Sequence, residues 1–173
     1  GKWQINDFRV EPDAIRKHGF DDWCMWTGYE GENPISGERY MDAYINTPEG
    51  SRTYEGEFGP DIFCDFIINF IHENRDRPWL AYYPMVLTHG PFVPTPDEPD
   101  VKGTYDRFAA MTRYTDKIVG KLMSALDASG ERDETIMIFT TDNGSPGGIK
   151  GIRHGVEVMG AKGKISEAGL CQP

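Results

Sequence analysis

The stretch TIMIFTTDNG, from Thr135 to Gly144, is the most informative part of this chain about its fold class. Its first six residues are mostly apolar and rich in β-branched side chains, which is typical of a short strand buried on both faces of a parallel sheet. The run then changes abruptly to Asp142, Asn143 and Gly144. Ligands of open parallel sheets bind beyond the carboxyl ends of the strands, and a carboxylate next to an amide oxygen suits calcium or magnesium. The alternative is an ordinary turn after a buried strand, since Asp-Asn-Gly is also favourable turn sequence.

Length and composition indicate one globular domain, with 173 residues of which 38% are hydrophobic. The net charge of −10, without any basic stretch, argues against a nucleic-acid partner. No apolar run is long enough to span a membrane. The chain opens on GKW without an initiator methionine and closes on CQP, so we interpret it as a segment of a longer protein and predict no localisation. The three cysteines lack the spacing of a metal site, and Cys64 is expected to be a buried free thiol.

Periodicity along the chain predicts two helices and several strands. Apolar residues recur at helical spacing from Asp61 to about Asn74 and again from about Thr104 to Ser129, where Gly130 is a natural stop. Residues 39–46 and 51–57 are expected to form a hairpin around Pro48-Glu49-Gly50. Residues 79–87, WLAYYPMVL, are a second candidate for a buried strand, although Pro84 weakens it.

The order strand, long helix, strand predicts a βαβ crossover with two parallel strands, 79–87 and 135–140. Parallel strands end at the same edge of their sheet. We therefore expect His89, which follows the first strand, to lie near Asp142 and Asn143, which follow the second. On its own, a histidine in a Thr-His-Gly-Pro loop is more often a solvated loop residue, and it is the expected neighbourhood of Asp142 and Asn143 that favours a functional role for His89.

Two lysines are candidates for binding an anion, and one of them, Lys162, lies in a small-residue loop that would let its ammonium group approach closely. Lys162 belongs to the sequence GAKGK and Lys2 to GKW. The alternative for each is an exposed surface lysine, and nothing local distinguishes Lys162 from Lys164.

Four blocks in order resemble the sulfatase family of the alkaline-phosphatase-like superfamily. Gly1-Lys2-Trp3 is similar to the family's Gly-Lys-Trp-His block, and Thr88-His89-Gly90-Pro91 to its His-x-Pro loop. Thr141 to Gly144 resembles the metal loop, and residues 160–173 resemble the Gly-x-Lys-Gly block. Each motif is weak alone, but the resemblance spans essentially the whole chain. It implies an α/β fold that is part of an alkaline-phosphatase-like domain, with a mostly parallel sheet flanked by helices and with residues 1–173 inside one catalytic domain.

The resemblance also implies roles for single residues. Asp142 and Asn143 would bind calcium, while Lys2, His89 and Lys162 would contact the sulfate of a sulfated small molecule or glycan. Gln4 stands where the family has a histidine, so it can donate a hydrogen bond to substrate but has no titratable proton to transfer. Ala168 replaces a family glycine, and Cys171 stands where the family often has an arginine.

The family's nucleophile is a formylglycine made from cysteine or serine in a Cys/Ser-x-Pro/Ala-x-Arg motif. Cys171-Gln172-Pro173 fits only the first three places, so we expect the nucleophile outside this segment and expect the segment to be inactive alone. The leading hypothesis is a sulfuric ester hydrolase. The alternatives are a phosphoester hydrolase of the same superfamily and a non-catalytic domain that binds an anionic glycan.

Overall fold

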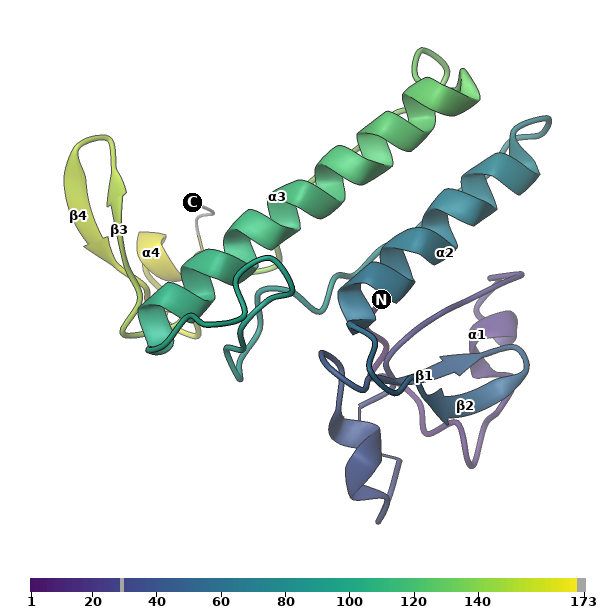
Figure 1. Cartoon of the computed structure of the whole chain (residues 1–173), viewed down its shortest axis with the longest axis horizontal. Coiled ribbons are helices and arrows are strands. Elements are labelled where there is room, and N and C mark those ends of the chain that lie inside the picture. The colour runs from purple at the N-terminus through teal and green to yellow at the C-terminus, as the bar shows by residue number, and fades with distance from the viewer. Residues whose placement is uncertain (29, 171–173) are drawn as a thin grey trace. The chain divides into compact units, whose positions relative to one another are not determined.

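The computed structural model describes residues 1–28 and 30–170. The chain divides into two compact units, Gly1–Glu134 and Thr135–Pro173, each with its own helices and strands (Figure 1). The expectation that residues 1–173 belong to one catalytic domain stays a prediction, because compact units within a chain do not decide whether they share a domain.

Helices dominate the first unit. Its elements are α1 (Ala14–Lys17), the 3₁₀ helix η1 (Pro34–Gly37), β1 (Tyr44–Thr47), β2 (Gly50–Thr53), α2 (Gly59–Asn74) and α3 (Thr104–Ser129). The predicted hairpin is confirmed, with shorter strands than expected: β1 and β2 pair in antiparallel register, Tyr44 opposite Thr53.

The two long helices confirm the periodicity in the sequence. Proline in the first turn of α2 suits a helix start, because the N–H that proline lacks would have no partner there. α3 ends at Gly130, whose φ of 78° is left-handed and costs glycine little. The helices lie side by side (Figure 1), and Asp61 of α2 accepts hydrogen bonds from Tyr114 at 2.5 Å and Lys121 at 3.0 Å, both on α3.

The main core of the first unit lies where α2 and α3 meet the hairpin and two extended segments. Burial of these apolar side chains is the main source of stability. Its members include Cys24, Trp26, Tyr40, Ile45, Phe58, Phe63, Cys64, Val86, Leu87, Met111, Tyr114, Ile118 and Leu122. A smaller aromatic cluster near α1 contains Trp3, Phe8, Ala14, Ile15 and Trp23. Cys24 and Cys64 are buried free thiols, so the expectation for Cys64 is confirmed.

The strand predicted over 79–87 is not confirmed. Among the described residues this segment joins no named strand. Its backbone accepts hydrogen bonds from Lys2 N–H at Pro84 O, 2.7 Å, and from His89 N–H at Val86 O, 3.2 Å. Proline contributes no ladder donor of its own, so Pro84 restricts pairing at this position. Val86 and Leu87 are nevertheless buried in the core, which fixes the segment just before His89.

The second unit corrects the prediction for the opening stretch. Residues 135–140 form no strand, and Ile136 and Ile138 are 88% and 82% exposed instead of buried on both faces. A strand must pair with at least one neighbour, and no described segment pairs with residues 135–140. The unit instead contains an unpredicted hairpin, β3 (Lys150–Arg153) and β4 (Val156–Met159), and the short helix α4 (Glu167–Leu170).

The β3–β4 hairpin follows from its two-residue turn. His154 and Gly155 both have positive φ, 50° and 80°, which is the conformation of the tight hairpin turn whose twist matches that of the strands. Lys150 and Glu157 form an ion pair at 2.9 Å across the strands.

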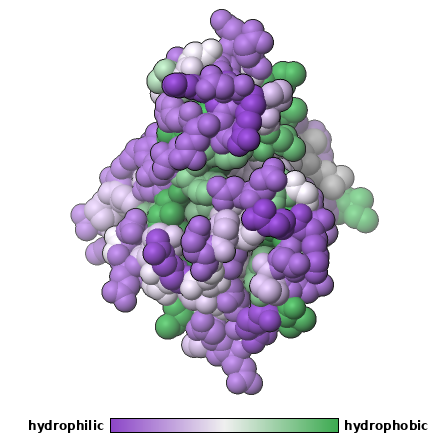
Figure 2. Space-filling view, turned by 90° about the vertical axis from the view of Figure 1, so that its right-hand side faces the viewer, coloured by the Kyte–Doolittle hydropathy of each residue, from purple (hydrophilic) through white to green (hydrophobic). Residues whose placement is uncertain are grey.

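The described residues thus contain four α-helices and two antiparallel two-stranded sheets, and the predicted parallel sheet is not confirmed. The face seen in Figure 2 is mostly hydrophilic with scattered hydrophobic side chains, as the charge of −10 leads one to expect. None of the described helices combines the length and the apolar character that crossing a membrane requires.

Candidate functional site

Lys2 is held by backbone contacts on both sides. It forms a parallel bridge with Trp26, and its N–H donates to Pro84 O at 2.7 Å. The next residue, Trp3, is buried and donates its N–H to Trp26 O at 2.8 Å. These contacts fix the backbone of Lys2 next to the segment that leads to His89, while its side chain remains half-buried.

Gln4 is exposed and lies against a glycine. A Cβ atom built on Gly28 would lie 2.8 Å from Gln4 Nε2, and Gly28 has a φ of 83°. Any larger residue at position 28 would therefore displace the Gln4 amide and strain the backbone.

His89 lies in a loop that two consecutive residues of the first unit hold in place. The Tyr40 hydroxyl lies 2.5 Å from His89 O and 2.9 Å from Val86 O. Arg39 Nη2 donates to Gly90 O and lies 3.3 Å from His89 Nδ1, which is itself 2.8 Å from Gly90 O. The imidazole is exposed. Sequence reasoning missed Arg39 and Tyr40, because they lie in an expected strand and belong to no motif.

In the second unit, the loop that carries Asp142 and Asn143 lies beside the loop that carries Lys162. Lys162 N–H donates to Ser145 O at 3.0 Å. Gly160 lies so close to the first loop that a Cβ atom there would be 2.6 Å from Ser145 O. The structure therefore brings together two of the predicted blocks, and the small residue at position 160 is what permits the approach.

The donor chemistry at Asp142 and Asn143 suits calcium in type but is incomplete in number. Asp142 is exposed and Asn143 is half-buried. A carboxylate and an amide oxygen are hard ligands, but calcium takes six to eight oxygens. The described residues contain no group of three or more His, Cys, Asp or Glu side chains able to hold a metal ion. These two residues are thus candidates for part of a calcium site.

The predicted site residues divide between the two units. Lys2, Gln4 and His89 belong to the first, and Asp142, Asn143 and Lys162 to the second. Because each unit stands by itself, the proximity of His89 to Asp142 stays a prediction.

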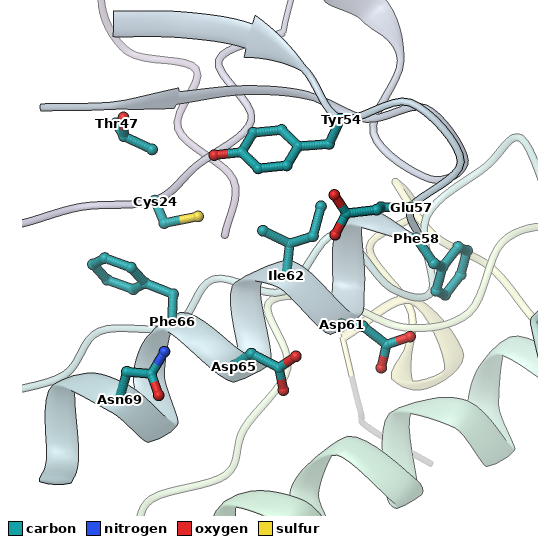
Figure 3. A pocket seen from close by; sticks show the side chains of 10 residues that line it. All are labelled: Cys24, Thr47, Tyr54, Glu57, Phe58, Asp61, Ile62, Asp65, Phe66 and Asn69. Carbon is teal, nitrogen blue, oxygen red and sulfur yellow. The ribbon is translucent and has the colours of Figure 1, made fainter. Parts of the chain in front are cut away.

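A pocket of ≈ 460 Å³ lies elsewhere in the first unit, between α2 and the β1–β2 hairpin (Figure 3). Glu57, Asp61 and Asp65 give it an acidic lining, and none of the predicted site residues reaches it. Burial raises the pKa of the Cys24 thiol in its wall to about 11, so this thiol is protonated and a poor nucleophile at neutral pH. We therefore do not assign the chemistry to this pocket. Cys171-Gln172-Pro173, the partial match to the nucleophile motif, lies outside the described residues.

Comparison with known proteins assigns the family. The sulfatase family model matches residues 1–164, so the chain belongs to the sulfatase family. Membership implies the alkaline-phosphatase-like α/β fold and confirms the resemblance to the sulfatase family.

Individual relatives are similar at moderate identity. The chain is 27% identical over 164 residues to an N-acetylgalactosamine-6-sulfatase of Mus musculus, covering 84% of this chain and 30% of that protein. It is 23% identical over 178 residues to an ulvan-active sulfatase of Formosa agariphila, covering 88% and 34%. It is 32% identical over 122 residues to human arylsulfatase A, covering 67% and 22%. The chain therefore spans about a third or less of the length of these relatives.

Proposed function

We propose that this chain contributes calcium- and sulfate-binding residues to a sulfuric ester hydrolase. The observation that carries the proposal is the match of the sulfatase family to residues 1–164, which contains all six predicted site residues. Relatives named for N-acetylgalactosamine-6-sulfate and for ulvan favour a sulfated sugar as the substrate class.

Each residue has a role that its chemistry suits. Lys2 and Lys162 would offset negative charge on the sulfuryl oxygens, and His89 would donate a proton toward the leaving oxygen. Gln4 would donate a hydrogen bond to the substrate without transferring a proton. Asp142 and Asn143 would supply oxygen ligands to calcium, and the bound ion would further offset sulfuryl charge. The formylglycine nucleophile is expected outside these 173 residues.

Hydrogen bonds within the second unit support this division of roles. Lys162 N–H bonds to Ser145, two residues after Asn143, so an ammonium group and the metal-type oxygens come from adjacent loops. A calcium ion bound by the first loop and the ammonium group of Lys162 on the second would both favour an anionic ligand over a cationic one.

Matched esters test the proposal in the full-length protein. The nitrophenyl sulfate and the nitrophenyl phosphate share one leaving group, so their relative rates report only on the transferred group. We expect turnover of the sulfate to exceed that of the phosphate. The reverse order would favour the phosphoester hydrolase, and absence of turnover with retained binding of a sulfated glycan would favour the non-catalytic domain.

His89→Ala tests the proton donor. General acid catalysis typically contributes about 10²–10⁴-fold, so kcat should fall by that order for an alkyl sulfate. The loss should be smaller for nitrophenyl sulfate, because a good leaving group needs less protonation. His72→Ala, an exposed histidine near the end of α2, is the matched control and should keep wild-type turnover. Equal activity of the two variants on the alkyl sulfate would remove His89 from the site.

A further inference from the structure

Arg39 is a cation without an acidic partner in a chain whose net charge is −10. A guanidinium group stays protonated in proteins, so its charge cannot be removed by a proton loss. The chain has 28 acidic residues, yet no ion pair of Arg39 occurs within residues 1–28 and 30–170. Its Nε is buried, and no described residue offers it a hydrogen-bond partner. A partly dehydrated charge attracts an anion more strongly than one in bulk water, so Arg39 suits an anionic ligand.

Two aromatic rings hold the guanidinium group in place. Its carbon lies 4.5 Å from the centroid of the Trp26 ring and 5.2 Å from that of the Tyr40 ring. Both rings are buried, and Trp26 is itself fixed by a hydrogen bond from its Nε1 to Ser36 O at 3.0 Å. Stacking on an aromatic face fixes the plane of a guanidinium and leaves its N–H groups along the edge for acceptors. Arg39 therefore presents its charge from a fixed position.

The contacts of Arg39 place it beside two of the predicted site residues. Its Nη2 donates to Gly90 O and lies 3.3 Å from His89 Nδ1. The backbone of Trp26, whose ring carries the guanidinium, forms a parallel bridge with Lys2. Arg39 thus lies next to the loop of His89 and on the ring of the residue that pairs with Lys2. An anion bound to Arg39 would lie beside these candidate sulfate contacts of the first unit.

The guanidinium keeps a donor for a ligand. Its contacts with Gly90 O and His89 Nδ1 both involve Nη2. None of the described residues accepts a hydrogen bond from Nη1. Arg39 is half-buried and His89 is exposed, so this edge of the loop is open to a ligand. The availability of Nη1 does not depend on the tautomer of His89, because Nη1 takes no part in that contact.

Charge balance in the proposed site favours a second anionic group over the sulfate that is cleaved. A sulfate ester carries a single negative charge, and its proposed partners already include Lys2, Lys162 and calcium. We propose that Arg39 binds a second anionic group of the substrate, a carboxylate or a further sulfate on the same or the neighbouring sugar, and thereby selects glycans that carry it. This inference rests on the proposed function for the rest of the substrate. Planar oxyanions match the donor geometry of a guanidinium better than that of an ammonium group.

Matched disaccharides test the inference in the full-length protein. One pair consists of a sulfated sugar linked to a uronic acid and the same disaccharide after reduction of the carboxyl group to hydroxymethyl. A second pair differs by one additional sulfate. For the wild type we expect kcat/KM to be about 10- to 100-fold higher for the more anionic member of at least one pair, the range of one charge-assisted hydrogen bond. No preference in either pair would overturn the inference.

Arg39→Gln removes the charge and should abolish most of this preference. The measured quantity is the ratio of kcat/KM within a pair, because any loosening of the Gly90 loop lowers both members alike. The change should appear mainly in KM, as for a contact made equally in the ground state and the transition state. Arg39→Met keeps the apolar stem against Trp26, should give the same ratio, and serves if the glutamine variant does not fold. Equal losses on both members of a pair would overturn the inference.

Arg52→Gln is the matched control. Arg52 also stacks on an aromatic ring, that of Tyr54 at 4.5 Å, and donates to its hydroxyl at 3.0 Å. It lies on β2, and its described hydrogen bond is to Tyr54 and not to the His89 loop. Its loss should therefore leave the ratio unchanged, and an equal fall of the ratio in Arg52→Gln and Arg39→Gln would reduce the effect to general surface charge and overturn the inference.

Binding measurements separate this inference from the proposed function. Absence of turnover on every sulfate ester would contradict the proposed function. Calorimetry of the same disaccharide pairs with the wild type and Arg39→Gln would then decide the role of Arg39 by itself. Tighter binding of the more anionic member, lost in Arg39→Gln, would support the inference, whereas a preference kept in the variant or absent from both proteins would overturn it.

Discussion

The phenolic oxygen of Tyr40 lies 2.5 Å from the carbonyl oxygen of His89 and 2.9 Å from that of Val86. Tyr40 is buried, and burial raises the pKa of its phenol, so the hydroxyl stays protonated and remains a donor. The Tyr40 side chain thus connects the segment just before β1 to the loop that carries the candidate catalytic histidine.

Tyr40→Phe should therefore destabilise the fold and loosen the His89 loop. The variant keeps the ring but leaves two buried or half-buried carbonyls without this donor, which costs roughly 1 kcal/mol in the free energy of unfolding. Urea unfolding of the two proteins measures the loss. Tyr105→Phe, at an exposed position in the first turn of α3, is the control and should be neutral. Equal unfolding free energies for Tyr40→Phe and the wild type would show that the hydroxyl adds nothing.

Gly160→Ala should destabilise the second unit. The added methyl group would lie 2.6 Å from Ser145 O, so the loop of Lys162 would have to move away from the loop of Asp142. Forced displacement of packed backbone typically costs about 1–3 kcal/mol. Gly151→Ala on β3 is the control, because a Cβ atom there meets nothing within 4 Å. The midpoints of chemical unfolding compare the two variants, and similar midpoints would contradict the close approach.

The sequence predicted what local patterns encode. Apolar periodicity, together with the glycine and proline residues that end helices and form turns, predicted α2, α3 and the β1–β2 hairpin. All three elements are confirmed. The apolar run 135–140 carries no information about which segment lies beside it. Its strand prediction failed because pairing is a property of neighbours, and no described neighbour pairs with it.

The candidate site shows the same limit. Lys2, His89, Asp142 and Lys162 stand out because each belongs to a recognisable block. Arg39 and Tyr40 could not be found this way, since their contacts with His89 and Gly90 span about 50 residues and depend on the folded core. The bond between Lys162 and Ser145 likewise joins two loops through backbone atoms, which no side-chain motif records.

Raising the pH should destabilise the fold through its buried thiols. Burial raises the pKa of the Cys64 thiol from 9.0 to about 11. Between these values the unfolded chain loses the thiol proton while the folded chain keeps it, so ionisation favours unfolding. The contribution of Cys64 is complete below pH 9 and is lost as the pH rises toward 11. The difference in unfolding free energy between the wild type and Cys64→Ala should therefore shrink over this range, and a constant difference would contradict the prediction.

Asp142→Ala should lower metal content and activity together in the full-length protein. The substitution removes the charged member of the two proposed oxygen ligands, and hard cations depend strongly on carboxylate charge. Metal analysis of the purified protein and turnover of nitrophenyl sulfate are the two measurements. Asp133→Ala, at an exposed position in the first unit, controls for the loss of one negative charge. Full calcium occupancy in Asp142→Ala would exclude Asp142 as a ligand.

Lys162→Ala and Lys164→Ala form a pair that the sequence alone cannot rank. Both lysines are exposed, but the backbone of Lys162 bonds to Ser145 beside the candidate metal loop, whereas that of Lys164 bonds to Ala161 in its own turn.

We expect Lys162→Ala to lower kcat/KM for a sulfate ester by about 10- to 100-fold, since a hydrogen bond to a charged group contributes about 1.5–3 kcal/mol. Lys164→Ala should stay within about twofold of the wild type, because exposed charges away from a site contribute little. Inorganic sulfate as a competitive inhibitor provides a second reading, since its inhibition constant should rise in Lys162→Ala alone. Equal kinetic losses in the two variants would mean that general positive charge in this loop, and not the placement of Lys162 beside Ser145, attracts the anion.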